Sequence, residues 1–276
     1  MTILVTGGRG RIARAVVAGL TAAGLDPRVA SRDTSAVPGS VPFDLTDPST
    51  VSAALRDVTQ VFLYAEPTTA AAFVEAADAA GVKKVVLLSS MSSYADNEDA
   101  AADPHAETER VIKTGAYAVT CLQPGAFMTN AIFWSYALRA TGQIRLPYLD
   151  AEEAPIHEQD IADAAVQVLL AGPGSPHDGR AYPLSGPESM TRRRQIEQIT
   201  EVTGVPIEAV DLAPAQAEEE MSRGMRNQAQ FRSLMSYWAS RVGLPHPIEP
   251  GVELLTAHPA RSWQTWLRDH PEVFAE

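Results

Sequence analysis

The most informative stretch of this chain is a glycine-rich turn near its amino end, Thr6-Gly7-Gly8-Arg9-Gly10-Arg11-Ile12-Ala13. An apolar run precedes the turn and residues of helical character follow it, so it should connect a strand with a helix. Glycine is needed where the backbone turns sharply and where its amides approach a pyrophosphate, and the amino end of a helix attracts the anion. The pattern Gly-x-x-Gly-x-x-Ala therefore predicts a dinucleotide site, whereas the Gly-Lys-Ser/Thr of a Walker loop is missing.

Residues 28–31, which form the second expected strand, lead directly into Arg32. Sites selective for NAD commonly carry an acidic residue at this point, which binds the ribose 2′-hydroxyl and repels a 2′-phosphate. Arg32 has the opposite charge, Ser31 offers a hydroxyl donor, and Arg9 in the glycine turn adds positive charge. We therefore expect NADPH to be preferred over NADH. The alternative is that Arg32 is a solvated loop residue beside Asp33.

Residues at the ends of other expected strands complete the candidate cofactor site. Asp44 is placed to meet the adenine edge, although it is equally suited to capping the turn before Asp47-Pro48. Glu66 would stand near the ribose or the nicotinamide ring, or else begin the next helix through Pro67. The residues expected to bind the cofactor are Thr6, Gly7, Arg9, Gly10, Arg11, Ile12, Ser31, Arg32, Asp44, Leu45, Ala65, Glu66, Ser89, Pro124, Gly125 and Phe127.

The elements that must position these residues alternate between strand and helix, which is typical of a parallel sheet built from β-α-β units. The expected strands are short apolar runs at residues 2–6, 28–31, 41–43, 61–65, 85–89, 118–123 and 181–184. The expected helices cover residues 11–23, a segment beginning at 47–48, then 69–80, 106–114, 127–140, 160–171, 191–203 and 218–240. This pattern predicts a doubly wound α/β fold. We expect residues 1–150 to form the NAD(P)-binding core and residues 151–276 to complete it and form a lobe.

The composition narrows the class of protein. The chain has 276 residues and a net charge of −12, which disfavours general binding to nucleic acids or anionic membranes. Cys121 is the only cysteine, which excludes an intramolecular disulfide and fits a reducing compartment. No apolar run approaches the roughly 20 residues that a membrane-spanning helix needs, and the amino end lacks the basic residues of a secretory signal. We therefore expect a cytoplasmic protein.

Further motifs follow the glycine turn in a characteristic order along nearly the whole chain. They are Asp44-Leu45-Thr46-Asp47-Pro48, Val61-Phe62-Leu63, Gly81-Val82-Lys83-Lys84-Val85-Val86-Leu87-Leu88-Ser89-Ser90, Gln123-Pro124-Gly125-Ala126-Phe127-Met128-Thr129-Asn130, Asp160-Ile161-Ala162 and Tyr182-Pro183-Leu184-Ser185-Gly186-Pro187-Glu188. Together they resemble the NmrA-like branch of the atypical short-chain dehydrogenases/reductases. The resemblance implies a Rossmann-type doubly wound parallel sheet with a small C-terminal substrate lobe, and NAD(P)H bound across the strand ends. Members include quinone and other small-molecule reductases, and also catalytically silent proteins that sense the NADP redox ratio.

The catalytic residues depart from the pattern usual in short-chain reductases. Those enzymes carry Tyr-x-x-x-Lys, in which the lysine lowers the pKa of the tyrosine. Tyr94 follows a serine cluster suitably, but Glu98 occupies the lysine position and would oppose phenolate formation. The nearest substitute is His105, whose imidazole can donate a proton near neutral pH. The alternative is that His105 is simply a solvated residue at the start of a helix. Ser89 is suited to binding a substrate carbonyl or the nicotinamide ribose, or to satisfying backbone groups at its strand end.

An apolar segment after Gly125 offers a pocket for a flat substrate, although aromatic residues at helical spacing more often belong to a core. Its members are Phe127, Met128, Phe133, Trp134 and Tyr136. The six histidines are scattered without a His-x-x-x-His pair, so no metal site is predicted. No Gly-x-Ser-x-Gly elbow is present, which argues against a serine hydrolase. The run Arg192-Arg193-Arg194 is most simply a solvated helix face.

The residues and the resemblance together predict an NADPH-dependent oxidoreductase that passes hydride to a small carbonyl or quinone-like, aromatic substrate. His105, Ser89 and Tyr94 are the candidate catalytic residues. A quinone needs little from the protein beyond positioning, which makes the missing dyad tolerable. The alternative is a non-catalytic NADP(H)-sensing regulatory protein that binds a protein partner, which the missing dyad favours and the aromatic segment disfavours. A homodimer is compatible with this fold, and neither nucleic acid nor membrane is an expected partner.

Overall fold

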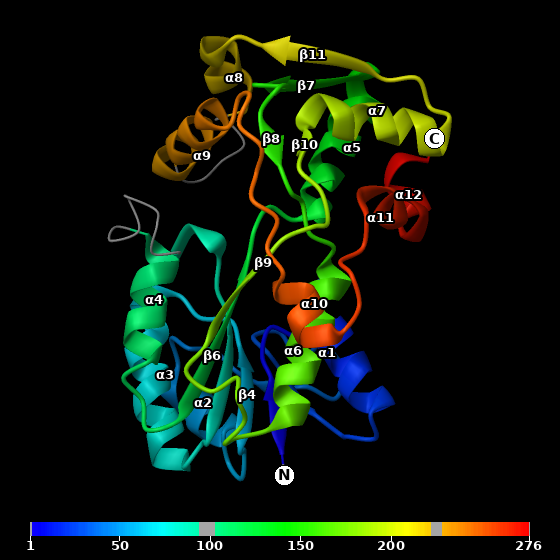
Figure 1. The fold of residues 1–276 in the computed structure, drawn as a ribbon. Helices are drawn as coiled ribbons and strands as arrows, with labels where there is room; N and C mark the ends of the chain where they lie inside the picture. The colour runs from blue at the N-terminus through cyan, green and yellow to red at the C-terminus, as the bar shows by residue number, and fades with distance from the viewer. Residues whose placement is uncertain (1, 94–102, 222–227, 276) are drawn as a thin grey trace. The chain divides into compact units, whose positions relative to one another are not determined.

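The central feature of the computed structural model, which describes residues 2–93, 103–221 and 228–275, is a seven-stranded parallel sheet (Figure 1). Its order is β3-β2-β1-β4-β5-β6-β9. The strands are β1 (Ile3–Val5), β2 (Arg28–Ser31), β3 (Val41–Pro42), β4 (Gln60–Leu63), β5 (Lys84–Leu88), β6 (Ala118–Pro124) and β9 (Ala181–Leu184). The order reverses between β1 and β4. Ligands of such sheets bind beyond the carboxyl ends of the strands at this reversal.

Helices cover both faces of this sheet (Figure 1). They are α1 (Arg11–Ala22), α2 (Pro48–Ala54), α3 (Pro67–Ala80), α4 (Pro104–Ile112), α6 (Glu158–Ala171) and the short α10 (Gly251–Thr256). On one face α1 packs closely on α6, since a Cβ at Gly19 would lie only 2.8 Å from Cγ2 of Val166. On the other face α2, α3 and α4 contribute Val51, Phe73 and Ile112 to the core. Burial on both faces explains the continuous apolar strands.

The chain divides into two compact units. The first comprises Met1–Gly125, Glu158–Leu184 and Pro250–Pro259, and the second Ala126–His157, Ser185–Glu249 and Ala260–Glu276. Residues 126–150, which we expected in the core, therefore belong to the second unit. The reason is that the chain first passes through α5 (Ala131–Thr141) and β7 (Gln143–Pro147), which pack within the second unit. It then returns to the first unit, where α6 covers the sheet and β9 is its last strand.

The second unit is built from helices and two small sheets. Besides α5 and β7 it contains the 3₁₀ turn η3 (Met128–Asn130), β8 (Glu152–Glu153), β10 (Met190–Thr191), α7 (Arg192–Thr203), β11 (Glu208–Leu212), α8 (Pro214–Met221), α9 (Gln228–Ser240), α11 (Trp263–Asp269) and α12 (Pro271–Phe274). β7 pairs in parallel with β11, and β8 pairs antiparallel with β10. Trp263 and Trp266 stack at 5.2 Å between ring centroids in its core.

The predicted doubly wound α/β fold is confirmed, and the expected strands at 28–31 and 181–184 have the observed bounds. One helix prediction needs correction. The helix expected at 127–140 begins only at Ala131, because η3 precedes it. Of the helix expected over 218–240, residues 218–221 belong to α8 and residues 228–240 form α9, and residues 222–227 lie outside the described residues. The small sheets and the C-terminal helices α10 to α12 were not predicted.

A buried lysine ties the sheet to the loop between α6 and β9. The ammonium of Lys84 donates to Asp178 Oδ1 at 2.7 Å, to Ser175 Oγ at 2.8 Å and to the carbonyl of Gly172 at 2.9 Å. These three acceptors match the three protons of an ammonium, which makes its burial tolerable. The arrangement accounts for a charged residue at the start of a central strand.

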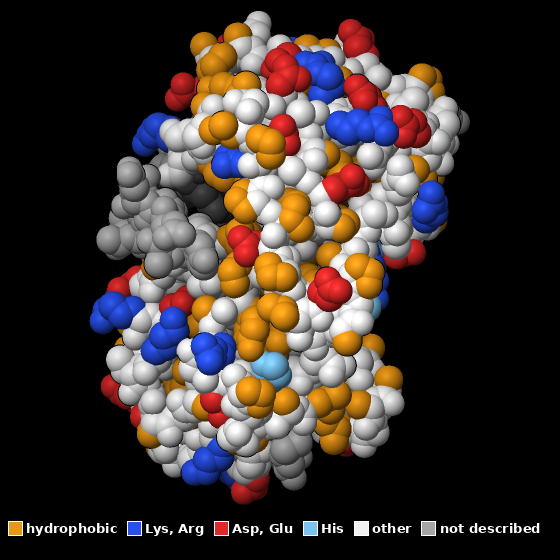
Figure 2. All heavy atoms as spheres, in the orientation of Figure 1, with side chains coloured by type: hydrophobic (Ala, Val, Ile, Leu, Met, Phe, Trp, Pro, Cys, Tyr) orange, Lys and Arg blue, Asp and Glu red, His pale blue; other side chains and the backbone are white. Residues whose placement is uncertain are grey.

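Charged side chains of both signs are interspersed on the face drawn in Figure 2. Within the described ranges, no helix is long and apolar enough to span a bilayer. The large hydrophobic side chains that are exposed are Phe133, Tyr136, Leu170, Val242, Leu244, Ile248 and Leu254.

Candidate functional site

The glycine turn is held tightly between the ends of β1 and β2. Gly7 has φ of 70°, a left-handed conformation that favours glycine. The N–H of Gly10 donates to the carbonyl of Gly7 at 2.7 Å, and the N–H of Gly8 donates to the carbonyl of Ala30 at 2.9 Å. A Cβ at Gly8 would lie 2.7 Å from Cγ1 of Val29 and 3.2 Å from the carbonyl oxygen of Ala30, so a side chain there would press against β2. The turn therefore needs its glycines for the backbone shape that the sequence predicted.

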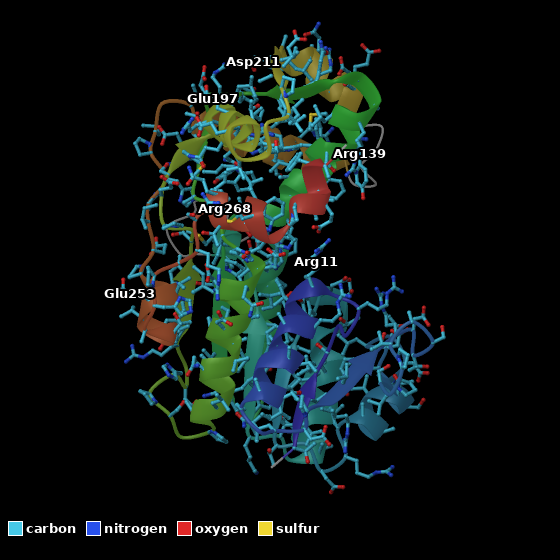
Figure 3. All side chains as sticks on the ribbon, turned by 90° about the vertical axis from the view of Figure 1, so that its right-hand side faces the viewer. Arg11, Arg139, Glu197, Asp211, Glu253 and Arg268 are labelled. Atoms are coloured by element: carbon cyan, nitrogen blue, oxygen red, sulfur yellow. The ribbon has the colours of Figure 1, made fainter. Side chains whose placement is uncertain are left out.

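The amino end of α1 has the properties of an anion site. Gly10 is the N-cap residue, with an extended backbone and no side chain to cap the helix, and the first turn contains no acidic residue. The N–H groups of the first turn, from Arg11 onward, have no acceptor within the helix. Ile12 is buried, whereas Arg11 is exposed at this end of α1 (Figure 3). Backbone amides, helix dipole and a nearby guanidinium thus all favour a negatively charged group.

Two arginines flank the loop after β2. Arg9 lies 3.7 Å from Asp33 through Nη1 and Oδ2, and Arg32 is exposed. The pKa of the Asp33 carboxyl is lowered mainly by the hydrogen bond from the Ser35 hydroxyl, and also by the charge of Arg9. The buried Ser31 hydroxyl donates to the carbonyl of Asp33 at 2.9 Å. Its proton is thus used within the loop, and the two guanidinium groups are the stronger candidates for a phosphate.

Asp44 and Glu66 occupy the structural positions that we considered as alternatives. Asp44 Oδ1 accepts from the N–H and the hydroxyl of Thr46, which lower the pKa of Asp44, with a smaller effect from the charge of Arg32. Glu66 is the N-cap residue of α3, directly before Pro67, and is exposed. Neither arrangement prevents the side chain from lying beside a bound nucleotide.

Two further candidates serve the core through their side chains. Leu45 and Ala65 are partly buried and pack against the hydrophobic cluster beneath α2 and α3. Thr6 is buried, and its hydroxyl donates to the carbonyl of Phe62 at 3.0 Å and accepts from the N–H of Tyr64 at 2.9 Å. The Thr6 hydroxyl thus links the end of β1 to β4, and the cofactor contact expected of Thr6 stays a prediction.

The ends of β5 and β6 are joined by a buried carboxylate that the sequence analysis missed. Glu109 of α4 accepts hydrogen bonds at Oε1 from Ser89 at 2.6 Å, from Ser93 at 2.8 Å and from the amide of Gln123 at 2.8 Å. Its Oε2 accepts from Lys113 at 2.7 Å. Burial alone would raise the pKa of Glu109, but these hydrogen bonds outweigh it and lower the pKa. The hydroxyl proton of Ser89 is thus directed to an ionised carboxylate, away from any substrate carbonyl.

His105 lies in the first turn of α4 with an exposed side chain, and its N–H donates to Oδ1 of the N-cap residue Asp103 at 2.8 Å. Glu109 follows one turn later on the same helix. The imidazole is therefore available to a ligand near the start of α4. Tyr94, the third catalytic candidate, lies outside the described residues.

Residues 7–171, from the glycine turn to the end of α6, match the family described as NAD(P)H-binding. The chain belongs to this family. It is 32% identical to the (4-alkanoyl-5-oxo-2,5-dihydrofuran-3-yl)methyl phosphate reductase of Streptomyces griseus, with 99% of both chains covered. It is 28% identical to the NAD(P)H azoreductase of Xenophilus azovorans, again with 99% of both chains covered.

The fold is similar to that of an Escherichia coli NADPH-dependent quinone oxidoreductase whose crystal structure contains NADPH. The TM-score is 0.82 at 21% identity, with 99% of this chain and 100% of that chain covered. The fold of the first unit is thus the Rossmann-type fold that the resemblance implied. The protein is an NAD(P)H-dependent oxidoreductase of the atypical, NmrA-like short-chain type.

The carboxyl end of β6 belongs to the first unit of this oxidoreductase. Pro124 is buried and pairs with Leu184 of β9. The N–H of Gly125 donates to the carbonyl of Leu184 at 2.9 Å, and a Cβ at Gly125 would lie 3.1 Å from Sδ of Met91. Phe127, by contrast, lies in the second unit, where it is the N-cap residue of η3.

The apolar segment that we expected to line a pocket is divided between the interior and the surface of the second unit. Met128 and Trp134 are buried in its core. Phe133 and Tyr136 on α5 are 73% and 60% exposed. Phe127 is half-buried, so Phe133 and Tyr136 are the most exposed aromatic rings of this segment.

The interpretation of Arg192-Arg193-Arg194 as a solvated helix face is wrong for its first member. Arg192 is 2% exposed, its guanidinium lies 3.9 Å from the ring centroid of Trp238, and Nη1 donates to the carbonyl of Pro147 at 2.6 Å. The indole N–H of Trp238 in turn donates to Glu153 at 3.0 Å. The cation is held by an aromatic face and a nearby carboxylate, a use of arginine that sequence spacing did not reveal.

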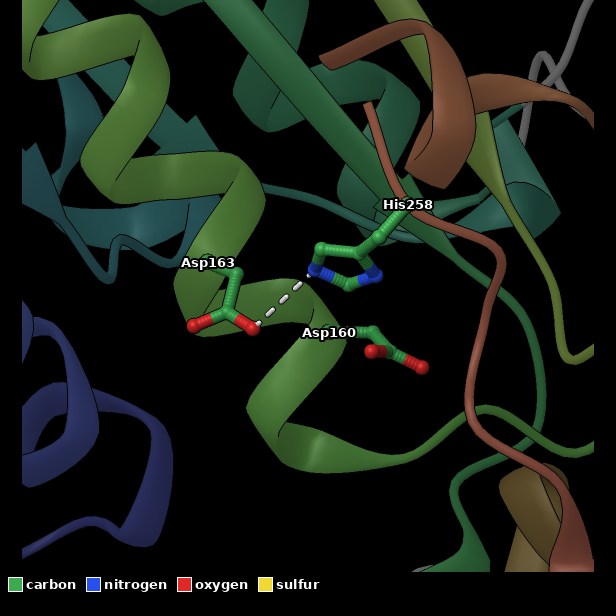
Figure 4. A group of neighbouring side chains, drawn as sticks. All are labelled: Asp160, Asp163 and His258. Atoms are coloured by element: carbon green, nitrogen blue, oxygen red, sulfur yellow. Dashed lines mark ion pairs between the residues drawn. The ribbon is translucent and has the colours of Figure 1, made fainter. Parts of the chain in front are cut away.

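Among the residues that the structure describes, Asp160, Asp163 and His258 of the first unit form a group of potential metal ligands (Figure 4). One ligand atom from each lies within 4.8 Å of the others, and His258 Nε2 is 3.5 Å from Asp163 Oδ2. Both aspartates belong to α6, and Asp160 lies in its first turn, where a carboxylate also interacts favourably with helix amides. The group links α6 to the segment after α10, and we assign it this structural role.

Proposed function

We propose that this oxidoreductase uses NADPH in preference to NADH and passes hydride to a small, aromatic carbonyl or quinone-like acceptor. The observation that carries the proposal is the pair of guanidinium groups, Arg9 and Arg32, beside a glycine turn that leads into an uncapped helix. A 2′-phosphate distinguishes the two cofactors, and arginine is the side chain best suited to bind it. The names of the relatives support a reductase of flat, conjugated molecules.

The first unit fits a dinucleotide. Gly7 and Gly8 allow a turn in which a Cβ would clash with Tyr64 or Val29, and the amides of Arg11 and Ile12 are at the positive end of α1. Arg32 would hold the 2′-phosphate, and Pro124 and Gly125 lie at the strand end where the nicotinamide amide meets the backbone in this fold. When bound, the dihydronicotinamide supplies the hydride.

The proton that accompanies hydride transfer has a restricted set of donors. Glu109 is ionised at neutral pH because hydrogen bonds lower its pKa, and it accepts the hydrogen bond that the Ser89 hydroxyl donates. His105 is exposed and carries an imidazole, so it is the candidate proton donor for a carbonyl acceptor. The oxygens of a reduced quinone can collect protons from solvent, and we expect quinones not to depend on His105.

The deciding experiment is stopped-flow oxidation of NADPH by a panel of quinones and aromatic ketones, using the wild type, His105→Ala and His105→Gln. Both variants should slow ketone reduction by about 100-fold, since general acid catalysis is lost, while quinone reduction changes little. Equal rates in all three proteins would remove His105 from the mechanism. Tight NADPH binding without oxidation by any acceptor would contradict the proposed reductase and favour the NADP(H)-sensing alternative.

A further inference from the structure

Tyr64 follows β4 directly, at the point where the strand order of the sheet reverses. Its N–H donates to the hydroxyl of Thr6, which in turn donates to the carbonyl of Phe62. The backbone at the end of β4 is therefore fixed against the end of β1. This places the Tyr64 side chain beside the glycine turn through main-chain contacts that do not depend on the side chain itself.

The ring of Tyr64 lies along the glycine turn. A Cβ at Gly7 would come within 2.8 Å of Cδ2 and 3.1 Å of Cε2 of the ring. A Cβ at Gly10 would lie 3.6 Å from the Tyr64 hydroxyl oxygen. The ring also meets Phe62 edge to face, with 5.6 Å between centroids and an interplanar angle of 88°. The ring is thus held in place, with its hydroxyl beside the N-cap residue of α1.

This hydroxyl has no hydrogen-bond partner among residues 2–93, 103–221 and 228–275. Burial raises the pKa of Tyr64, so the phenol stays protonated and can act as a donor at neutral pH. The hydroxyl is not one of the fully buried side-chain atoms that lack a partner, in contrast to the hydroxyl of Tyr117. The amides in the first turn of α1 likewise have no acceptor within the helix. Both sets of donors stand next to Gly10.

We infer that Tyr64 is a cofactor-binding residue whose hydroxyl donates a hydrogen bond to the pyrophosphate of the dinucleotide at the amino end of α1. The inference rests on the proposed function, because it requires a dinucleotide at the glycine turn. An oxygen of the pyrophosphate would accept from the phenol and from the helix amides together. Gly7 then has a second purpose, since any side chain there would push the Tyr64 ring out of this position.

The pyrophosphate is common to NADPH and NADH, whereas the 2′-phosphate is not. Loss of the Tyr64 hydroxyl must therefore weaken both cofactors by the same factor. This distinguishes Tyr64 from Arg32, whose loss affects NADPH alone.

The test is Tyr64→Phe, which keeps the ring on Gly7 and removes only the hydroxyl. Dissociation constants for NADPH and NADH are measured by nicotinamide fluorescence without any acceptor present. Both should rise by about tenfold, as expected for one hydrogen bond to a charged group, with an unchanged melting temperature of the free protein. Tyr117→Phe is the matched control, because this buried hydroxyl also lacks a partner within the described residues and lies before β6. It should leave both constants unchanged.

Unchanged dissociation constants in Tyr64→Phe, or a loss confined to NADPH, would overturn the role of Tyr64 while the cofactor site stands. A wild type that binds neither dinucleotide would overturn the proposed function and this inference with it.

Discussion

Replacing Arg32 by aspartate is expected to weaken the binding of NADPH by about 100-fold while that of NADH changes little. The substitution removes a guanidinium from the end of β2 and puts a carboxylate where the 2′-phosphate is expected. In the wild type the charge of Arg32 already acts on this region, since it contributes to the lowered pKa of Asp44. Fluorescence titration with each dinucleotide measures the effect.

The loss for NADPH should shrink as the salt concentration is raised, because Arg32 is exposed and its charge is screened. Arg56→Asp provides a control with the same change of charge. Arg56 is exposed and precedes β4, at the amino ends of the strands and therefore at the opposite end from the glycine turn. An equal loss of both dinucleotides in Arg32→Asp, or of neither, would remove Arg32 from the 2′-phosphate site.

The parts of the fold that the sequence predicted are those in which local pattern and tertiary structure agree. The strand at residues 28–31 is a short apolar run between turn residues, and the helix over 191–203 begins at Thr191, whose hydroxyl accepts from the N–H of Arg194 at 3.0 Å. The glycine turn is likewise local, since its strand, turn and helix are contiguous. Such segments carry their structural information within a few residues.

The parts that were missed depend on contacts between distant segments. Glu109 reads as an ordinary polar residue of an exposed helix, and only the pairing of β5 with β6 brings Ser89 and Gln123 together beneath it. Arg192 and Arg193 are neighbours in a basic run, but only the former faces the buried ring of Trp238. Spacing along the chain carries no signal for either arrangement. Tyr64 had a usable signal, because it directly follows the strand at the sheet reversal.

Replacing Glu109 by glutamine is expected to lower the free energy of unfolding by about 3 kcal/mol at pH 7, because the variant breaks a buried, charged hydrogen-bond network. The carboxylate accepts from Ser89 and Gln123 at one oxygen and from Lys113 at the other. The amide of glutamine has only one oxygen, so its NH2 group must face one of these donors. The ends of β5 and β6 would then lose the group that joins them, and urea unfolding at neutral pH measures the difference.

Glu107→Gln is the matched control, since Glu107 is on the same helix but exposed, where its pair with Arg110 contributes little. The pH dependence separates the charge of Glu109 from its packing. The folded-state pKa of Glu109 is lowered, so its contribution is complete above the unfolded pKa of about 4.3 and is lost as the pH falls through the folded pKa. The stability difference between wild type and Glu109→Gln should therefore be constant from pH 7 to about 5 and narrow below about 4. A difference that persists unchanged into this acidic range would show that the shape of the side chain, and not its ionised carboxylate, holds the two strand ends together.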